Sequence, residues 1–227
     1  MTQQTIPPRE AAPRDRQERP SLRSVVSGAI HNLYRQLSAE DSGQASAARA
    51  ALSRLRRAVG RTPKQDPMAW SVTLEQTVPL LTEWSDAAGD EPTPQEYGAF
   101  TALTLYAMHQ QGNRQPMHSS EHDFSFAVGE LARISESDSI KPRFDALIAA
   151  TAPAARAYHL RTLVSLLSSK GIPLDYGRLA EDLSVLQRPD RSHGVVLRWG
   201  RGFAVGFMPP KKQKEEQDAD KEPRKTA

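Results

Sequence analysis

Basic side chains are concentrated in residues 42–65, a segment that contains no acidic residue. Its positively charged residues are Arg49, Arg54, Arg56, Arg57, Arg61 and Lys64. At a helical step of about 100° per residue, the apolar residues of this segment fall on one stripe and the arginines on the remaining face. Guanidinium groups make planar, bidentate contacts with phosphate oxygens. The pattern therefore predicts a basic helix face suited to the phosphates of a nucleic acid.

The charge is sorted along the chain, although the formal net charge is only +3. Residues 65–113 contain no Lys or Arg but several Asp and Glu residues. A basic and an acidic face on one small protein give an oriented field, suited to nucleic acid on one side and a basic partner on the other. Runs of charge also occur as ordinary solvated helix faces, and this alternative stays open.

A second set of basic residues follows in the C-terminal half, again with more arginine than lysine. Its members are Lys141, Arg143, Arg156, His159, Arg161, Arg188, Arg191, Arg198 and Arg201. Few acids accompany them, so this half is predicted to carry a basic face of its own.

Residues 118–123 contain histidines and carboxylates, with His109 upstream, and these side chain types could bind a metal ion. His118 and His122 are four residues apart, as two metal ligands on one helix face are. Glu121 and Asp123 lie beside them, but the segment reads as a polar loop in which Ser119, Glu121 and Asp123 act as capping residues. No Ser–His–Asp set, Walker loop or dinucleotide motif is present, and there is no cysteine. We therefore predict no catalytic residue, metal or cofactor, with a His-loop metal enzyme as a less favoured alternative.

The elements that position these residues are predicted to be helices. Thr93, Pro94 and Glu96 form a predicted capping box with proline at the first helical position, and this helix should end near Gly112. Another helix should begin after Asp66 and be interrupted at Pro79. Helical spacing also covers residues 24–37, 124–134, 143–150, 154–170 and 175–186. Residues 194–207 are ambiguous, because apolar residues alternate as in a strand and glycines weaken either assignment.

An all-α fold of two helical-bundle domains follows, with disordered N- and C-terminal tails. The predicted divisions are a tail over 1–20, an N-terminal domain over 21–138, a C-terminal domain over 139–208 and a charged tail over 209–227. No segment is apolar and long enough for export or membrane insertion, so we expect a cytoplasmic protein without a membrane partner.

Most aromatic residues occur at helical spacings, which favours core packing over base stacking. They are Trp70, Trp84, Phe100, Tyr106, Phe124, Phe126, Phe144 and Tyr158. Trp199 lies between Arg198 and Arg201 and is the one aromatic considered for a nucleic-acid or protein contact. Anchoring of the C-terminal segment is the favoured interpretation even there.

Four motifs resemble one known family, in the order in which that family has them. They are ALSRLRRAVGR at 51–61, LYAMHQQG at 105–112, RFDALIAA at 143–150 and HLRTLVSLLSSKGIPLDYGRLAEDL at 159–183. Together they are similar to the CasB family, the small subunit of the type I-E CRISPR Cascade complex. The resemblance covers residues 21–203 and leaves out both tails.

The resemblance implies a non-enzymatic, all-α subunit that takes part in antiviral defence. Its partners in the family are the other Cascade subunits (backbone and large subunit), a second copy of itself, and crRNA-guided target DNA. Members of the family help to stabilise the R-loop by holding the displaced DNA strand on a basic surface. The resemblance therefore implies both DNA binding and RNA binding.

The family pattern places its basic positions on Arg56, Arg57, Lys141, Arg143 and Arg161 of this chain. Some relatives have a second basic residue where Thr162 stands, and this sequence departs from them at that position. Arg54 and Arg61 join the predicted site by the helical wheel alone. A helical adaptor that binds acidic protein surfaces through the same basic faces is the main functional alternative.

Overall fold

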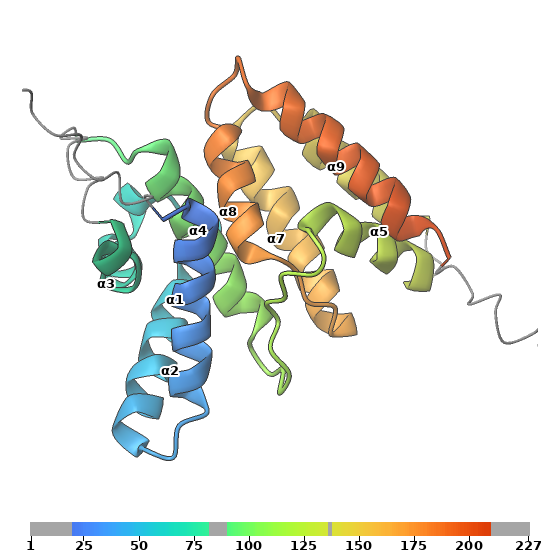
Figure 1. Cartoon of the computed structure of the whole chain (residues 1–227). Helices are drawn as coiled ribbons and strands as arrows, with labels where there is room; N and C mark the ends of the chain where they lie inside the picture. Colours follow the sequence, from blue (N-terminus) through green and yellow to red (C-terminus); the bar gives the residue numbers. More distant parts are fainter. Residues whose placement is uncertain (1–19, 82–89, 136–137, 210–227) are drawn as a thin grey trace, which may run out of the picture.

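The computed structural model describes residues 20–81, 90–135 and 138–209, and these form an all-α fold (Figure 1). The helices, with one short 3-10 helix η1, are α1 (Leu22–Leu37), α2 (Ser42–Arg57), η1 (Pro63–Gln65), α3 (Pro67–Leu81), α4 (Pro94–His109), α5 (Phe124–Ser135), α6 (Ile140–Ala149), α7 (Pro153–Lys170), α8 (Tyr176–Val185) and α9 (Ser192–Phe207). No strand occurs in the described ranges. The predicted fold class is confirmed, whereas the predicted tails fall outside the described residues except for residues 20 and 209.

Several helix ends follow the capping signals of the sequence. The Thr93 hydroxyl accepts a hydrogen bond from the Glu96 amide at 3.2 Å, and the Thr93 amide donates to the Glu96 carboxylate at 2.7 Å. This capping box satisfies free amides at the start of α4. Gly171 ends α7 with a left-handed φ of 65°. The interruption predicted at Pro79 is wrong, because α3 continues to Leu81. Proline has a helix-compatible φ, and near a helix end it removes a single hydrogen bond.

Helix α4 lies at the centre of the fold. It is buried around its whole circumference between Gly98 and Ala107, so it lacks a solvent-facing stripe along most of its length. Helices α1, α2, α3, α7 and α8 all pack against it. One hydrophobic cluster includes residues from α1 through α9. Each of these neighbours must therefore turn its apolar face toward α4 and its polar face outward.

Helix α9 corrects the ambiguous assignment of residues 194–207. Its buried residues Val195, Trp199, Phe203 and Gly206 recur every three or four positions, which is helical spacing. Two glycines that weakened the prediction are required by the contact with α5. A Cβ atom at Gly206 would lie 2.1 Å from the carbonyl oxygen of Phe126, and one at Gly202 would lie 2.0 Å from the Ser125 hydroxyl.

Figure 1 shows α9 lying along α5 on one side of the molecule, while α1, α2 and α3 lie on the other. Helix α8 packs against α4 and α1, and α6 packs against α7. The division of the chain into two domains at residues 138–139 stays a prediction. None of the helices in the described ranges is long and apolar enough to span a membrane.

The predicted core role is confirmed for Phe100, Tyr106, Phe124 and Phe144, which are fully buried, and for Trp70, which is partly buried and packs against a buried cluster. Phe126 is partly buried and stacks on the exposed His122, and Trp84 lies outside the described residues. Tyr158 is 67% exposed, so its predicted place in the core is wrong. Tyr158 lies on the outer side of α7. It does not fall in the three- and four-residue spacing of the buried residues of that helix, so its side chain points away from the core.

The two glycines of α9 at positions 200 and 206 offer a matched test of the α5 contact. We expect Gly206→Ala to lower the free energy of unfolding by about 1–3 kcal/mol, because the new methyl group overlaps the backbone of α5. Gly200 has no atom within 4 Å of a Cβ built on it. Gly200→Ala should therefore raise the free energy of unfolding by about 0.5–1 kcal/mol through helix propensity. Urea unfolding measures both, and equal effects of the two changes would contradict the described packing.

Candidate nucleic-acid interface

Helix α2 carries the first basic set, and its orientation follows from its sequence. The Asp41 carboxylate accepts a hydrogen bond from the Gly43 amide at 2.8 Å and caps the helix. The side chains of Ala48, Leu52 and Leu55 are buried, and α2 packs against α1 and α4. With this stripe turned inward, the polar residues of α2 face solvent.

The arginines of α2 differ in their exposure and in their partners. Arg49, Arg54 and Arg57 are exposed, and Arg56 is half-buried. Within the described ranges, none of these four guanidinium groups forms an ion pair. Their positive charge is therefore available to an anion from outside the chain.

Arg61 departs from the prediction. The helical wheel places it on the same helix face as Arg54, but α2 ends at Arg57 and Gly60 then adopts a positive φ of 85°. The Arg61 guanidinium forms an ion pair with Asp66 at 3.0 Å. Lys64 likewise pairs with Glu91. Both acids come from the acidic segment, so acidic and basic residues meet here instead of lying on separate faces.

Helical spacing divides the α2 arginines between two sides. Arg54 and Arg57 are three residues apart and share one side, whereas Arg49 and Arg56 are two turns apart and share another. Arg49 and Arg56 border a surface depression of about 370 Å³ between α2 and the segment that follows α4. The predicted single basic face is thus two adjacent strips on one helix.

The second basic set is spread over α6, α7, the α8–α9 connection and α9, and three of its members, Lys141, Arg143 and Arg161, lie on the α6–α7 hairpin. Helix α7 packs against α4. Arg143 and Arg161 are exposed, and neither forms an ion pair with a described residue. The Lys141 ammonium lies 2.5 Å from the Asp145 carboxylate and 5.6 Å from the ring centroid of Phe203. Lys141 is therefore partly neutralised by its own helix, and Arg143 and Arg161 supply the free charge of this hairpin.

Two further basic residues of the C-terminal half serve the fold. Arg156 is buried, and its guanidinium donates to the carbonyl oxygens of Ala150, at 3.0 Å, and Leu186. Arg198 donates to the Asp182 carboxylate at 2.6 Å. The basic face predicted for this half is consequently smaller than the sequence indicates.

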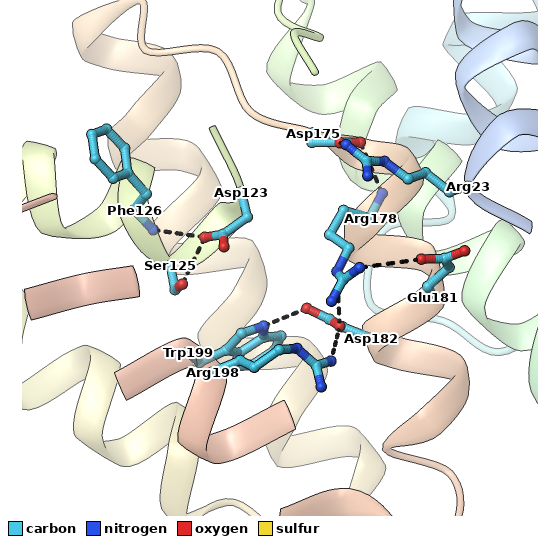
Figure 2. A network of polar contacts seen from close by, with 10 residues as sticks. All are labelled: Arg23, Asp123, Ser125, Phe126, Asp175, Arg178, Glu181, Asp182, Arg198 and Trp199. Carbon is cyan, nitrogen blue, oxygen red and sulfur yellow. Dashed lines mark hydrogen bonds and ion pairs between the residues drawn. The ribbon is translucent and has the colours of Figure 1, made fainter. Parts of the chain in front are cut away.

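Figure 2 shows the polar network that surrounds Asp182 and Asp175. The Trp199 indole donates to Asp182 at 2.7 Å and is buried, which confirms the interpretation of Trp199 as an anchor of the C-terminal segment. Burial raises the pKa of Asp182, and hydrogen bonds from Trp199 and Arg198 oppose that rise. Asp175 pairs with Arg23 and also accepts from the Arg178 amide at the start of α8.

The histidines of the loop alternative do not converge on one point. The Nδ1 atom of His118 is buried and accepts from the Tyr176 amide at 3.2 Å, whereas exposed His122 stacks on Phe126 with ring centroids 4.0 Å apart. Asp123 accepts from the Phe126 amide and caps α5, as predicted. No group of three His, Cys, Asp or Glu side chains in the described part of the chain is placed to hold a metal ion.

Comparison with known proteins identifies the family. The sequence profile of the CRISPR-associated protein Cse2 family matches residues 51–203. The chain belongs to the Cse2 family. The crystal structure of CasB from Thermobifida fusca is 31% identical, with a TM-score of 0.60, and the alignment covers 79% of this chain and 97% of that one. A comparison with curated protein sequences finds no match.

Two more distant structures share the fold of the Cse2 family. One is a Cse2-family protein from Thermus thermophilus, at 24% identity and a TM-score of 0.56, with 79% of this chain and 97% of that chain covered. The other is a chain of a structure described as a CRISPR RNA-guided surveillance complex, at 16% identity and a TM-score of 0.56, with 82% and 95% covered.

Buried His109 predicts a pH dependence of stability. Its Nδ1 atom lies 2.8 Å from the Tyr176 hydroxyl, and burial lowers the pKa of His109 from 6.5 to about 4. Because the unfolded chain takes up the proton first, the free energy of unfolding should fall between about pH 6.5 and pH 4, by up to about 3 kcal/mol. Denaturant titrations across this range should show a smaller fall for His109→Gln than for exposed His122→Gln. An unchanged fall in His109→Gln would contradict this assignment.

Proposed function

We propose that this chain is a non-catalytic small subunit of a type I-E CRISPR Cascade complex in the cytoplasm. In this role it stabilises the R-loop through sequence-independent contacts to the displaced DNA strand. The observation that carries the proposal is the set of arginines on α2 that have no acidic partner among the described residues, in a chain of the Cse2 family. Its partners are the backbone and large subunits, a second copy of the chain, and crRNA-guided target DNA.

Physical chemistry supports a role for unpaired charge in such a complex. R-loop formation exchanges one duplex for another of similar stability, so contacts to strand backbones can tip the balance. Arginines that contact phosphates do so without reading the bases, and the guide RNA then supplies the sequence specificity. Each neutralised phosphate releases counterions, which makes the contribution fall as salt rises.

The residues proposed to make these contacts differ in how much they are expected to contribute to phosphate binding. Arg54, Arg56 and Arg57 form the main group on α2, and Arg143 and Arg161 form a smaller group on the α6–α7 hairpin. Arg61 and Lys141 contribute less, because Asp66 and Asp145 already offset their charges.

Arg56 and Arg57 allow a direct test with Arg61 as the matched control. A reconstituted Cascade that lacks its small subunit is supplemented with the unchanged chain, with Arg56→Ala/Arg57→Ala, or with Arg61→Ala. R-loop formation on a matched duplex is then measured across a salt series. We expect the unchanged chain and Arg61→Ala to restore it, and the double variant to be deficient at low salt. Its salt dependence should be shallower by about 1.4 in log–log slope, as for two phosphate contacts with a single strand.

Two other outcomes have distinct meanings. If the unchanged chain assembles but does not restore R-loop formation, the proposed function is wrong. If the double variant restores it fully, the phosphate contacts lie elsewhere. If the chain is instead an adaptor that binds an acidic protein surface, the double variant should fail to assemble into the complex even in the absence of DNA. This outcome separates the adaptor alternative from the proposal.

A further inference from the structure

Tyr158 is the most exposed of the large apolar and aromatic side chains in the described residues. It lies on α7 with 67% of its surface accessible, and its ring forms a T-shaped pair with the adjacent His159 imidazole, with ring centroids 5.4 Å apart. Phe207, also exposed, stacks parallel on Phe203. Both faces of a tyrosine ring are apolar and suited to stacking, but single exposed aromatic residues are common on protein surfaces. The surroundings of Tyr158 therefore decide its meaning.

Tyr158 shares the α6–α7 hairpin with Arg143 and Arg161, whose guanidinium groups form no ion pair with a described residue. Arg161 lies three residues further along α7 and shares its side of the helix, with Cβ atoms about 5–6 Å apart at that spacing. Arg143 lies on α6, which packs against α7 across the short connection 150–152. Tyr158 and Arg143 lie at similar distances along their helices from this connection. Thr162 is half-buried and donates to the Tyr158 carbonyl oxygen at 3.0 Å.

We propose that Tyr158 is a stacking platform for an unpaired base of single-stranded DNA, whose neighbouring phosphates pair with Arg161 and Arg143. The inference rests on the proposed function and adds a second kind of contact to it. Arginines on α2 hold phosphates alone, whereas this hairpin offers an aromatic face within one nucleotide's reach of a guanidinium group. Stacking of this kind tolerates any base, because every base has a π face. The contact therefore strengthens binding without introducing sequence specificity.

The test removes the ring from the protein and the bases from the DNA independently. Complexes containing the full-length chain are titrated with two targets that share one target strand. In the first target, the displaced strand carries mismatched thymidines across the guide-paired region; in the second, it carries abasic deoxyriboses at the same positions. Both present the same number of phosphates. The variants are Tyr158→Ala, Tyr158→Phe and, as a control of similar exposure on α3, Met68→Ala (61% exposed).

We expect Tyr158→Ala to raise the Kd for the thymidine target about fivefold and to leave the Kd for the abasic target unchanged. Tyr158→Phe should stay within about twofold of the unchanged chain, and Met68→Ala should have no effect. The fivefold deficit should persist between about 50 and 200 mM salt, because stacking releases no counterions. The deficit of Arg161→Ala should shrink over the same range.

Two results overturn the stacking platform. One is an unchanged Kd of Tyr158→Ala for both targets. The other is an equal loss on both targets, which would assign Tyr158 to a protein contact or to the fold. Failure of the proposed function looks different, since a complex that lacks the small subunit would then bind both targets as tightly as a complex that contains the unchanged chain.

Discussion

The all-round burial of α4 is the constraint on which the rest of the structure depends. Its apolar residues from Gly98 to Ala107 leave it no solvent-facing side, so α1, α2, α3, α7 and α8 must cover it. At Gly98 the approach is so close that a Cβ atom would lie 2.4 Å from the Ala180 carbonyl oxygen of α8. Each covering helix turns its apolar face inward and presents its polar face to solvent. Arg49, Arg54 and Arg57 on α2 and Arg161 on α7 are exposed for this reason.

Local pairing then determines which of the basic residues keep an available charge. Acids that follow closely in the sequence or lie on the same helix offset Arg61 and Lys141, while Asp182 and Asp175 hold Arg198 and Arg23 within the fold. The arginines of α2 have no such neighbour, because the segment around them contains no acid. The composition, with its small net charge, does not indicate which basic residues lack an acidic partner. The binding capacity proposed here depends on the distribution of pairs and not on the net charge.

Local signals were sufficient for much of the fold. The capping box at Thr93, the glycine that ends α7 and the apolar stripe of α2 all act within a few residues, so the sequence predicts them. Contacts between distant segments were not predictable: Arg23 and Asp175 are 152 positions apart, and the glycines of α9 make sense only against α5. For the site, the sequence predicted Arg54, Arg56 and Arg57 on one exposed helix but could not show that Arg61 lies beyond the helix end or that Tyr158 is exposed.

The most direct measurement is a photo-crosslink from α2 to DNA in the assembled complex. Because the chain has no cysteine, Ala50→Cys offers one attachment point, exposed and one turn before Arg54. Met68→Cys on α3 is the matched control. With both DNA strands labelled separately, the account predicts crosslinks from position 50 to the displaced strand, in equal yield for two unrelated sequences, and none from position 68. Crosslinks from position 50 to protein subunits or to the target strand alone would contradict it.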